Sequence, residues 1–295
     1  MNILLTGCNG FIGRYTAAKL LEAGHCVHGV GTAPLPCSPM TMYSQVDISS
    51  GEQVAIFSRK LEQIDILVHC AAYISYNDSD PKIMMVNAVG TQNLVELAKA
   101  AGISKIVYCS SSGVIGYPVV HPITEDHPLH PTTVYHVSKL CGEYLVRASG
   151  INYIIFRIPS PVGIGMNENT ILPVLIKNCI NKSDVLLRGT GSRIQNYISI
   201  QDISSAILCA ITSRECGSFN LSGECISNIA LAELCKSIIK SDSNIVVLND
   251  DDPTDHYVWD LSPEHAENLL GFKSQISLSS TIEEIANYFR KRMEM

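Results

Sequence analysis

The residues with the clearest chemical potential are Tyr135 and Lys139, the ends of the stretch Tyr135-His136-Val137-Ser138-Lys139. The sequence pattern of Thr133 to Ser149 predicts a helix. Tyr135 and Lys139 are four positions apart, so the phenol and the ammonium group lie on one face of this helix. A cation beside a phenol lowers the pKa of the phenol from about 10, so the tyrosine can exchange a proton with a hydroxyl or carbonyl group. In most proteins a tyrosine and a lysine at this spacing are only a packed ring and a solvated amine. The surrounding fold therefore has to show whether this pair is catalytic or structural.

The pair comes after a predicted strand, Lys105 to Ser110, which opens into Ser110-Ser111-Ser112. Ligands of open α/β sheets bind outside the carboxyl ends of the strands. We therefore expect the serine hydroxyls and the Tyr135–Lys139 pair to lie close together at that edge, where they could transfer a proton to or from a ligand.

A second motif stands at the start of the chain, where Thr6 to Gly13 come after the apolar run Ile3-Leu4-Leu5. Its glycines have the spacing G-x-x-G-x-x-G, and a helical pattern opens behind them. Such a turn lets the backbone approach a pyrophosphate closely at the N-terminus of a helix. An ordinary strand-to-helix turn is the alternative, because a glycine triplet alone is weak evidence.

Short apolar runs alternate with helical patterns through the first half of the chain, as in βαβ units on a parallel sheet. We predict an α/β fold: a Rossmann-like doubly wound parallel sheet with a small mixed α/β substrate lobe. The boundaries are 1–157 for the dinucleotide-binding domain, with the sheet completed by about 193–215, 158–192 and 216–275 for the lobe, and 276–295 for a C-terminal helix. Ser49 to Glu52 and Ser280 to Glu283 predict helix starts with capping boxes.

Composition excludes several classes of function. The formal net charge of −7 includes no basic block, so we expect no nucleic-acid partner and no membrane partner. No apolar run approaches the ~18 residues of a membrane span, and no signal-peptide pattern opens the sequence. The eleven cysteines include no C-x-x-C pair, which favours free thiols over disulfides or a zinc site. We expect a cytoplasmic protein without a bound metal.

The ordered motifs of the chain resemble those of the extended short-chain dehydrogenase/reductase family, of the nucleotide-sugar-modifying epimerase/dehydratase type, over nearly the whole length. They are Thr6 to Gly13, Asp47-Ile48, His69 to Ala72, Asn87 with Gly90 to Asn93, Ser110 to Ser112, Tyr135 to Lys139, Phe156-Arg157, Pro161 to Gly163, Asn169 with Pro173, and Gly189 to Asp202.

The resemblance implies catalytic roles for three residues. Tyr135 would be the general acid/base, Lys139 would lower its pKa and bind the nicotinamide ribose, and Ser111 would hydrogen-bond the reacting oxygen. Ser112 is the near competitor of Ser111. The implied cofactor contacts are Gly7, Asn9, Gly10, Phe11, Ile12, Gly13, Arg14, Thr32, Asp47, Ile48, Ala71, Ala72, Asn87, Tyr135 and Lys139; the expected substrate contacts are Ser75, Tyr76, Ser112, Ser160, Asn169 and Arg193.

Two of these assignments have structural alternatives. Asn87 can instead tie its helix to the sheet, and Asp47 can be a turn residue at a strand end. Relatives commonly dimerise through the helices that correspond to Asn87 to Ala101 and Tyr135 to Arg147, so the resemblance also implies a homodimer.

The choice of cofactor depends on the end of the second strand. An acidic residue there selects NAD by binding the ribose hydroxyls, but this chain has Gly31 and then Thr32. Without the acid a 2′-phosphate is tolerable, with Arg14 or the Thr32 hydroxyl as contacts. We therefore expect NAD(P), with a slight preference for NADP.

The reaction is narrowed by the two residues directly after Ser111. In this family, 4,6-dehydration of a nucleotide sugar needs an Asp-Glu pair there, whereas this chain has Ser112-Gly113. A dehydratase is thus disfavoured. Reduction of a 4-keto-6-deoxy sugar is favoured modestly over 4-epimerisation with a retained NAD, and a non-catalytic cofactor-binding regulator is a remote alternative.

On the substrate side the chain departs from its relatives. Ser160 replaces the asparagine of relatives that bind nucleotide diphosphates, and Gln195 replaces an arginine. If that segment is extended, Arg193 and Gln195 share a face, and Arg193 can supply the missing charge; a solvated turn residue is the alternative.

Overall fold

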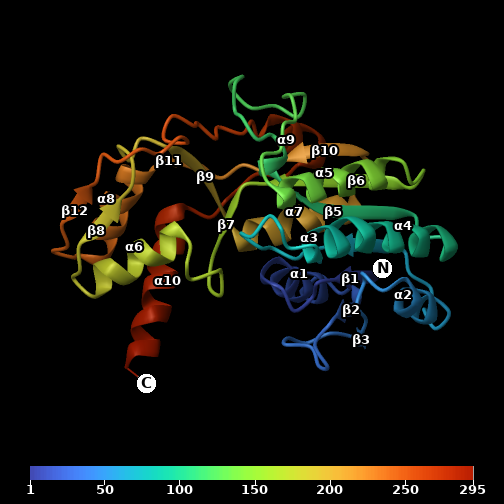
Figure 1. Ribbon diagram of the computed structural model, residues 1–295. Helices are drawn as coiled ribbons and strands as arrows, with labels where there is room; N and C mark the ends of the chain where they lie inside the picture. Colours follow the sequence, from blue (N-terminus) through green and yellow to red (C-terminus); the bar gives the residue numbers. More distant parts are fainter. Residues whose placement is uncertain (295) are drawn as a thin grey trace.

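The central element of the molecule is a parallel sheet of seven strands in the order β10-β6-β5-β4-β1-β2-β3 (Figure 1). This computed structural model describes residues 1–294, so Met295, the end of the predicted C-terminal segment, lies outside the described residues. The strand order reverses between β1 and β4, which opens a crevice at their carboxyl ends. The strands are β1 (Asn2–Thr6), β2 (Cys26–Gly31), β3 (Met42–Gln45), β4 (Ile66–His69), β5 (Lys105–Ser111), β6 (Asn152–Ile158) and β10 (Gly217–Asn220).

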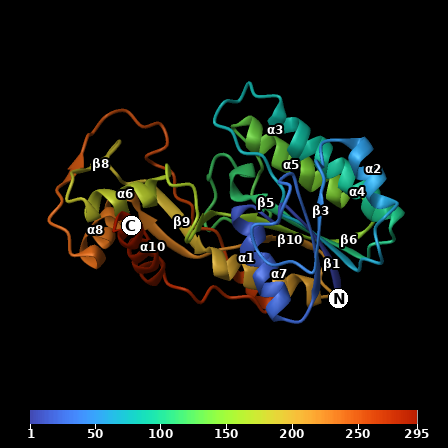
Figure 2. The ribbon, with the colours of Figure 1, turned by 90° about the horizontal axis from the view of Figure 1, so that it is seen from below.

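Helices cover both faces of the sheet, as Figure 2 shows. Along β1, Ile3 and Leu5 face one core while Leu4 faces the other, because successive strand residues point to opposite sides. The first core is closed by α1 (Phe11–Glu22) and α7 (Ile200–Thr212), and the second by α2 (Gly51–Ser58), α4 (Gly90–Ala100) and α5 (Val134–Arg147). The predicted Rossmann-like fold is confirmed.

Two short helical segments complete the side of the domain that carries the Tyr135–Lys139 pair. A long helical stretch is formed by α3 (Lys82–Met84), the π-helical turn η1 (Met85–Val89) and α4, which succeed one another without a break. The 3₁₀ turn η2 (Ser112–Val114) comes directly after β5. The helix α5 starts where the sequence indicates, because the Thr133 side chain accepts a hydrogen bond from the His136 backbone N–H.

A lobe with its own apolar core lies beside the carboxyl edge of the sheet (Figures 1 and 2). It has a mixed three-stranded sheet, with β9 between β7 and β11, and a two-stranded parallel sheet of β8 and β12. The elements are β7 (Ser160–Val162), β8 (Val185–Leu187), β9 (Ile194–Ser199), β11 (Glu224–Ser227), β12 (Ile245–Val247), α6 (Ile171–Ile180), α8 (Asn228–Ile239) and α10 (Leu278–Met293).

The strand that completes the central sheet differs from the expected one. Within 193–215, β9 pairs with lobe strands, and its Tyr197 packs into the lobe core. The seventh strand of the central sheet is β10, which begins at Gly217, in the segment assigned to the lobe; its Phe219 packs in the first core beside Phe156. The helix α9 (Glu264–Leu270), also in that segment, packs against the first core through Ala266 and Leu270.

Two predicted helix caps are shifted. Ser50, not Ser49, caps α2 by accepting from the Gln53 N–H, and Ser277, not Ser280, caps α10. In both cases the cap is another serine earlier or later in the same turn, and its hydroxyl accepts from a backbone N–H three residues further on. The sequence pattern therefore identifies the helix start but not the capping residue.

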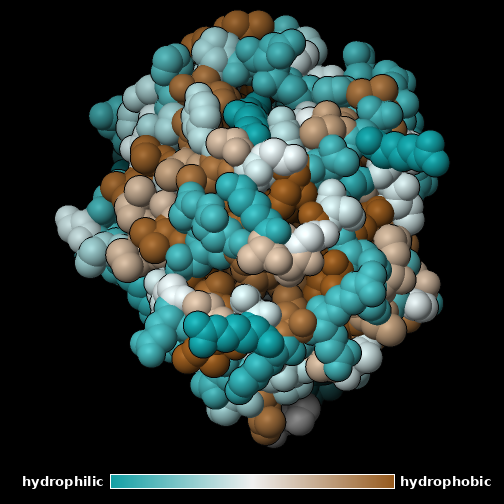
Figure 3. All heavy atoms as spheres, turned by 90° about the vertical axis from the view of Figure 1, so that its right-hand side faces the viewer, coloured by the Kyte–Doolittle hydropathy of each residue, from teal (hydrophilic) through white to brown (hydrophobic). Residues whose placement is uncertain are grey.

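The end of the molecule that faces the viewer in Figure 3 shows hydrophilic and hydrophobic residues interspersed. No helix within residues 1–294 is both long and apolar enough to cross a membrane.

Candidate active site

The glycine turn between β1 and α1 is shaped by close backbone contacts. Gly7 has a φ of +67°, and a Cβ there would lie 2.6 Å from the Ala71 Cα; a Cβ at Gly13 would lie 2.1 Å from the Gly7 carbonyl oxygen. Gly10 precedes the first turn of α1 without a side-chain cap. Free backbone N–H groups and the positive end of a helix dipole form a cradle for an anion such as a pyrophosphate.

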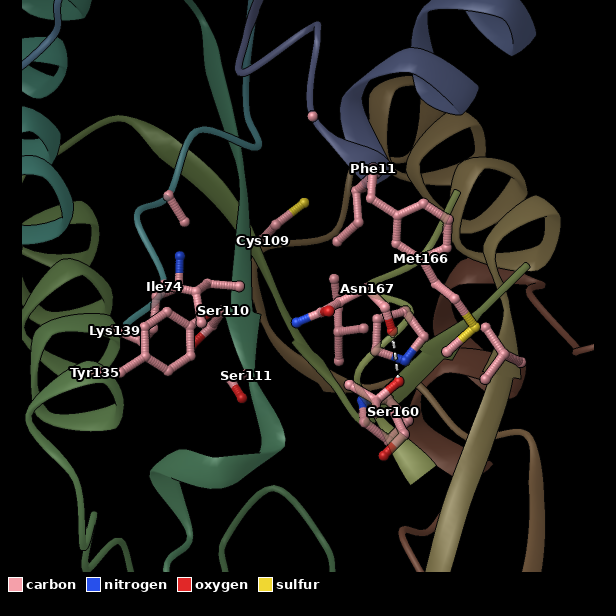
Figure 4. Close-up of a pocket in the computed structure, with 18 of the residues that line it drawn as sticks. Phe11, Ile74, Cys109, Ser110, Ser111, Tyr135, Lys139, Ser160, Met166 and Asn167 are labelled. Carbon is pink, nitrogen blue, oxygen red and sulfur yellow. Dashed lines mark hydrogen bonds between the residues drawn. The ribbon is translucent and has the colours of Figure 1, made fainter. Parts of the chain in front are cut away.

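This cradle lines a cavity of about 600 Å³ between the carboxyl edge of the sheet and the lobe. Figure 4 shows Tyr135, Lys139 and Ser111 on one wall, with Ser160, Met166 and Asn167 on the opposite wall. The predicted site residues that line the cavity are Gly10, Phe11, Ile12, Gly13, Ala72, Tyr76, Ser111, Tyr135, Lys139 and Ser160.

The Tyr135–Lys139 pair faces the cavity from α5. Lys139 is only 2% exposed, and its Nζ lies 4.2 Å from the centre of the Tyr108 ring, so a cation–π contact supports the buried charge. Burial lowers the pKa of Lys139 to about 8 and raises the pKa of Tyr135 to about 12. The phenol is therefore protonated at neutral pH in the free protein.

Ser111 and Ser112 are separated by their surroundings. Ser111, at the end of β5, lines the cavity, and its Oγ accepts from the Gly113 N–H at 3.1 Å. Ser112 is buried in η2 and does not line the cavity. The geometry thus brings Ser111 rather than Ser112 to the Tyr135–Lys139 pair.

Asn87 fixes α5 through the π-helical turn. Its Nδ2 donates to the Tyr73 carbonyl and to Ser138 Oγ, both at 2.9 Å, and its Oδ1 accepts from the Tyr73 N–H at 2.7 Å. Ser138 in turn donates to the Tyr135 carbonyl. All these bonds stay within the protein, so Asn87 holds the loop after β4 and α5 together, which is the structural alternative for this residue.

A buried ion pair anchors the other side of α5. Glu143 of α5 is 0% exposed and Arg157 of β6 is 2% exposed, and their oxygen and nitrogen atoms approach to 3.1 Å. Glu143 also accepts from Ser110 Oγ at 2.7 Å and from Arg147 at 2.8 Å. These bonds connect α5 to the ends of β5 and β6.

Arg14 has partners that the sequence did not predict. Its guanidinium donates to the Ile164 carbonyl at 2.6 Å and lies against the Phe11 and Tyr15 rings. This carbonyl and the two rings hold the guanidinium toward the lobe.

The other cofactor residues predicted around β2 and β3 do not line the cavity. Thr32 is exposed at the end of β2, and Asp47 Oδ1 accepts from the Ser49 N–H and hydroxyl at 2.9 and 2.7 Å, as a turn residue does. Ile48 packs in the second core. Asn9 binds the loop after β2, donating to the Leu35 carbonyl and accepting from the Cys37 N–H.

Two predicted substrate residues lie away from the cavity wall. Asn169 is exposed, and Ser75 Oγ accepts from the Asn77 N–H. Their neighbours line the cavity instead: Ile74 and Tyr76 in the loop after β4, and Asn167 and Thr170 before α6. The sequence identifies the loops that border the cavity, but the backbone conformation of each loop decides which of its side chains point into it.

Arg193 and Gln195 share a face, as expected for an extended segment. With its amide oxygen turned toward the guanidinium, Gln195 accepts from Arg193 Nε at 2.8 Å and Nη2 at 2.7 Å. Arg193 Nη1 donates to Thr254 Oγ1 at 3.0 Å. Gln195 lines the cavity and Arg193 stands behind it, so Arg193 orients the amide rather than facing the ligand.

Sequence reasoning missed several lining residues. Cys70 and Cys109 place their Sγ atoms 3.5 Å apart at the ends of β4 and β5, where the register of the two strands makes them neighbours. The lobe contributes Met166 and Tyr197, and His136 lies beside Tyr135. Cys70, Tyr197 and His136 stand within motifs that the sequence offered, so these motifs could have singled them out, whereas Met166 stands in none of them.

The switch-point cavity, the glycine turn and the Tyr135–Lys139 pair define a dinucleotide-binding α/β protein of the short-chain dehydrogenase/reductase class. Residues 3–222 match the model of the NAD dependent epimerase/dehydratase family, and the chain belongs to this family. The resemblance found in the sequence is confirmed.

Individual relatives span nearly the whole chain. A putative UDP-glucose 4-epimerase of Methanocaldococcus jannaschii is 26% identical over 306 residues, which cover 98% of each sequence. UDP-glucuronic acid decarboxylase 1 of Xenopus tropicalis is 25% identical over 313 residues, 99% of this chain and 73% of the relative. The crystal structure of UDP-glucose 4-epimerase from Thermotoga maritima with UDP-glucose has a TM-score of 0.88 and 25% identity, with 99% and 100% of the chains covered.

Proposed function

We propose that the chain is a nucleotide-sugar 4-epimerase that uses NAD. The observation that carries this proposal is the meeting of Ser111, Tyr135 and Lys139 on one wall of a cavity whose adjoining edge is the glycine cradle. The similarity to named 4-epimerases over the full length supports this reaction. The absence of a carboxylate at residues 112 and 113 argues against dehydration.

NAD fits the residues of the cradle better than NADP. The uncapped start of α1 would hold the pyrophosphate, and Lys139 would hold the nicotinamide ribose. Arg14, one of the two contacts expected for a 2′-phosphate, instead donates to the Ile164 carbonyl, which supports NAD. A bound NAD would supply the acceptor of a hydride from the sugar carbon and its donor on return.

The protein groups would move the proton. Ser111 Oγ donates a hydrogen bond to the reacting sugar oxygen, and Tyr135 takes the hydroxyl proton as the carbon is oxidised. Because burial raises the pKa of Tyr135, the phenol has to release its own proton to solvent before it can take the proton of the sugar hydroxyl, and the positive charge of Lys139 favours the phenolate. Tyr135 returns the proton when the carbonyl is reduced from the other face.

Reduction of a 4-keto-6-deoxy nucleotide sugar is the second candidate. Gly31 at the end of β2 favours it, because no acid there holds NAD tightly enough for permanent retention. In this reaction the protonated Tyr135 is the proton donor from the start.

The test supplies purified protein with UDP-glucose and a trace of NAD, and separately with a 4-keto-6-deoxy nucleotide sugar and stoichiometric NADH or NADPH. We expect the 4-epimer of UDP-glucose without net change in NAD, and a loss of about 10²- to 10⁴-fold in Tyr135→Phe. Consumption of reduced cofactor with the keto sugar alone identifies the reductase. Cofactor binding without turnover of either substrate overturns both reactions and identifies a non-catalytic cofactor-binding regulator.

A further inference from the structure

We propose that His136 is a substrate-contacting residue whose Nε2–H donates a hydrogen bond to a hydroxyl oxygen of the sugar, next to the reacting carbon. The inference rests on the proposed nucleotide-sugar chemistry and adds a residue to it. His136 is next to Tyr135 on α5 and lines the cavity together with Tyr135 and Ser111. The Tyr135 and His136 rings meet edge to face, with centres 5.3 Å apart.

The imidazole occupies the place of a side chain at residue 113. A Cβ on Gly113 would lie 2.1 Å from His136 Nε2 and 2.4 Å from both Cδ2 and Cε1. Gly113 does not have a positive φ, so its backbone conformation suits alanine as well. The glycine is therefore required by the space that the imidazole fills, and not by the turn.

A second contact sets the direction of the ring. Thr133 Oγ1 accepts from the His136 backbone N–H at 3.2 Å and lies 2.9 Å from His136 Nδ1. The Thr133 hydroxyl can donate its one proton to Nδ1 or accept from an Nδ1–H, and we assign the first arrangement. Donation to Nδ1 places the imidazole proton on Nε2, so the ring offers a donor.

The charge state of the ring suits this role. Burial lowers the pKa of His136, and the carboxylate of Asp78, which accepts from the Val134 N–H, opposes this shift. The ring is uncharged at neutral pH and binds a sugar hydroxyl as a neutral donor. Ser111 and His136 then hold two neighbouring sugar oxygens, which fixes the carbon in front of Tyr135.

The contact between Gly113 and the His136 ring suggests a substitution that displaces the ring without changing His136 itself. Alanine at residue 113 would push the imidazole out, whereas Gly51→Ala is a matched control, since a Cβ there meets only Asn93 Oδ1 at 3.6 Å. His136→Gln keeps an N–H donor at a similar reach, and His136→Met keeps the length without the donor.

We expect kcat/KM for UDP-glucose to fall about tenfold or more in His136→Met and in Gly113→Ala, with kcat affected at least as much as KM. His136→Gln should recover most of the activity, and Gly51→Ala should match wild type. The double variant Gly113→Ala/His136→Met should lose no more than either single variant, since both remove the same contact. Wild-type activity in His136→Met, or additive losses in the double variant, overturns the assignment.

A binding experiment separates this inference from the proposed reaction. In the ¹⁵N spectrum of the histidine rings, recorded with NAD present, we expect an Nε2–H tautomer for His136 and a shift of its Nε2 signal with UDP-glucose but not with UDP. An equal shift with UDP, or none with UDP-glucose, overturns the sugar contact. If wild type binds UDP-glucose with the expected shift but turns nothing over, the proposed reaction fails and the contact stands.

Discussion

Lys139 shows most clearly how one residue is tuned by its surroundings. It is an ammonium group 2% exposed, placed over the Tyr108 ring, with Cys109 among its neighbours. Burial disfavours the charged form, so its pKa falls to about 8. A solvent-exposed lysine, with a pKa of about 10.4, is fully protonated at neutral pH, whereas the pKa of Lys139 lies close to neutral pH.

The lowered pKa of Lys139 predicts a pH dependence of stability. Between about 8 in the folded state and about 10.4 in the unfolded state, the unfolded chain binds more protons, so this residue makes the fold more stable as pH rises. Relative to Lys139→Met, the free energy of unfolding of wild type should increase by about 2 kcal/mol from about pH 7 to about pH 9.5. Urea unfolding of both proteins measures this difference. A difference that does not change with pH contradicts the lowered pKa.

At the scale of elements, the position of α5 depends on the buried Glu143–Arg157 pair. Glu143→Leu leaves the Arg157 charge buried without its partner, which should reduce the free energy of unfolding by about 3–5 kcal/mol. The double variant Glu143→Leu/Arg157→Leu should regain part of this loss. Glu96→Leu is the control, because Glu96 pairs with Lys99 on the surface, where the change should stay within about 1 kcal/mol. Equal effects of Glu143→Leu and Glu96→Leu in urea unfolding would refute the anchoring role.

At the scale of the whole molecule, the outer face of η1 and α5 predicts a homodimer. The apolar residues Met85, Val89, Val137 and Tyr144 are 41–62% exposed there, and the family resemblance points to the same helices. We expect sedimentation equilibrium to give a dimer for wild type and a monomer for Val137→Glu/Tyr144→Glu, because two charges would be buried without partners. Leu186→Glu, at an exposed position of β8 in the lobe, should remain a dimer. A monomeric wild type would rule the dimer out.

The sequence by itself determined the parts of this protein that depend on local backbone geometry. The glycine spacing of Thr6 to Gly13, the helical spacing of Tyr135 and Lys139, and the alternation of strands and helices each depend on residues a few positions apart. They were enough to predict the Rossmann-like sheet and the family. The family resemblance also implied Ser111 rather than Ser112, and of these two only Ser111 lines the cavity.

Tertiary structure alone decided which distant segments meet. Strand pairing assigned β9 to the lobe and β10 to the central sheet. The partners of Arg14 and Arg193 are a carbonyl and an amide brought close by folding, and the sequence predicted neither contact. The fit of the His136 ring against Gly113 likewise joins two elements. Such contacts depend on the packing of segments far apart in the chain, and no local pattern encodes them.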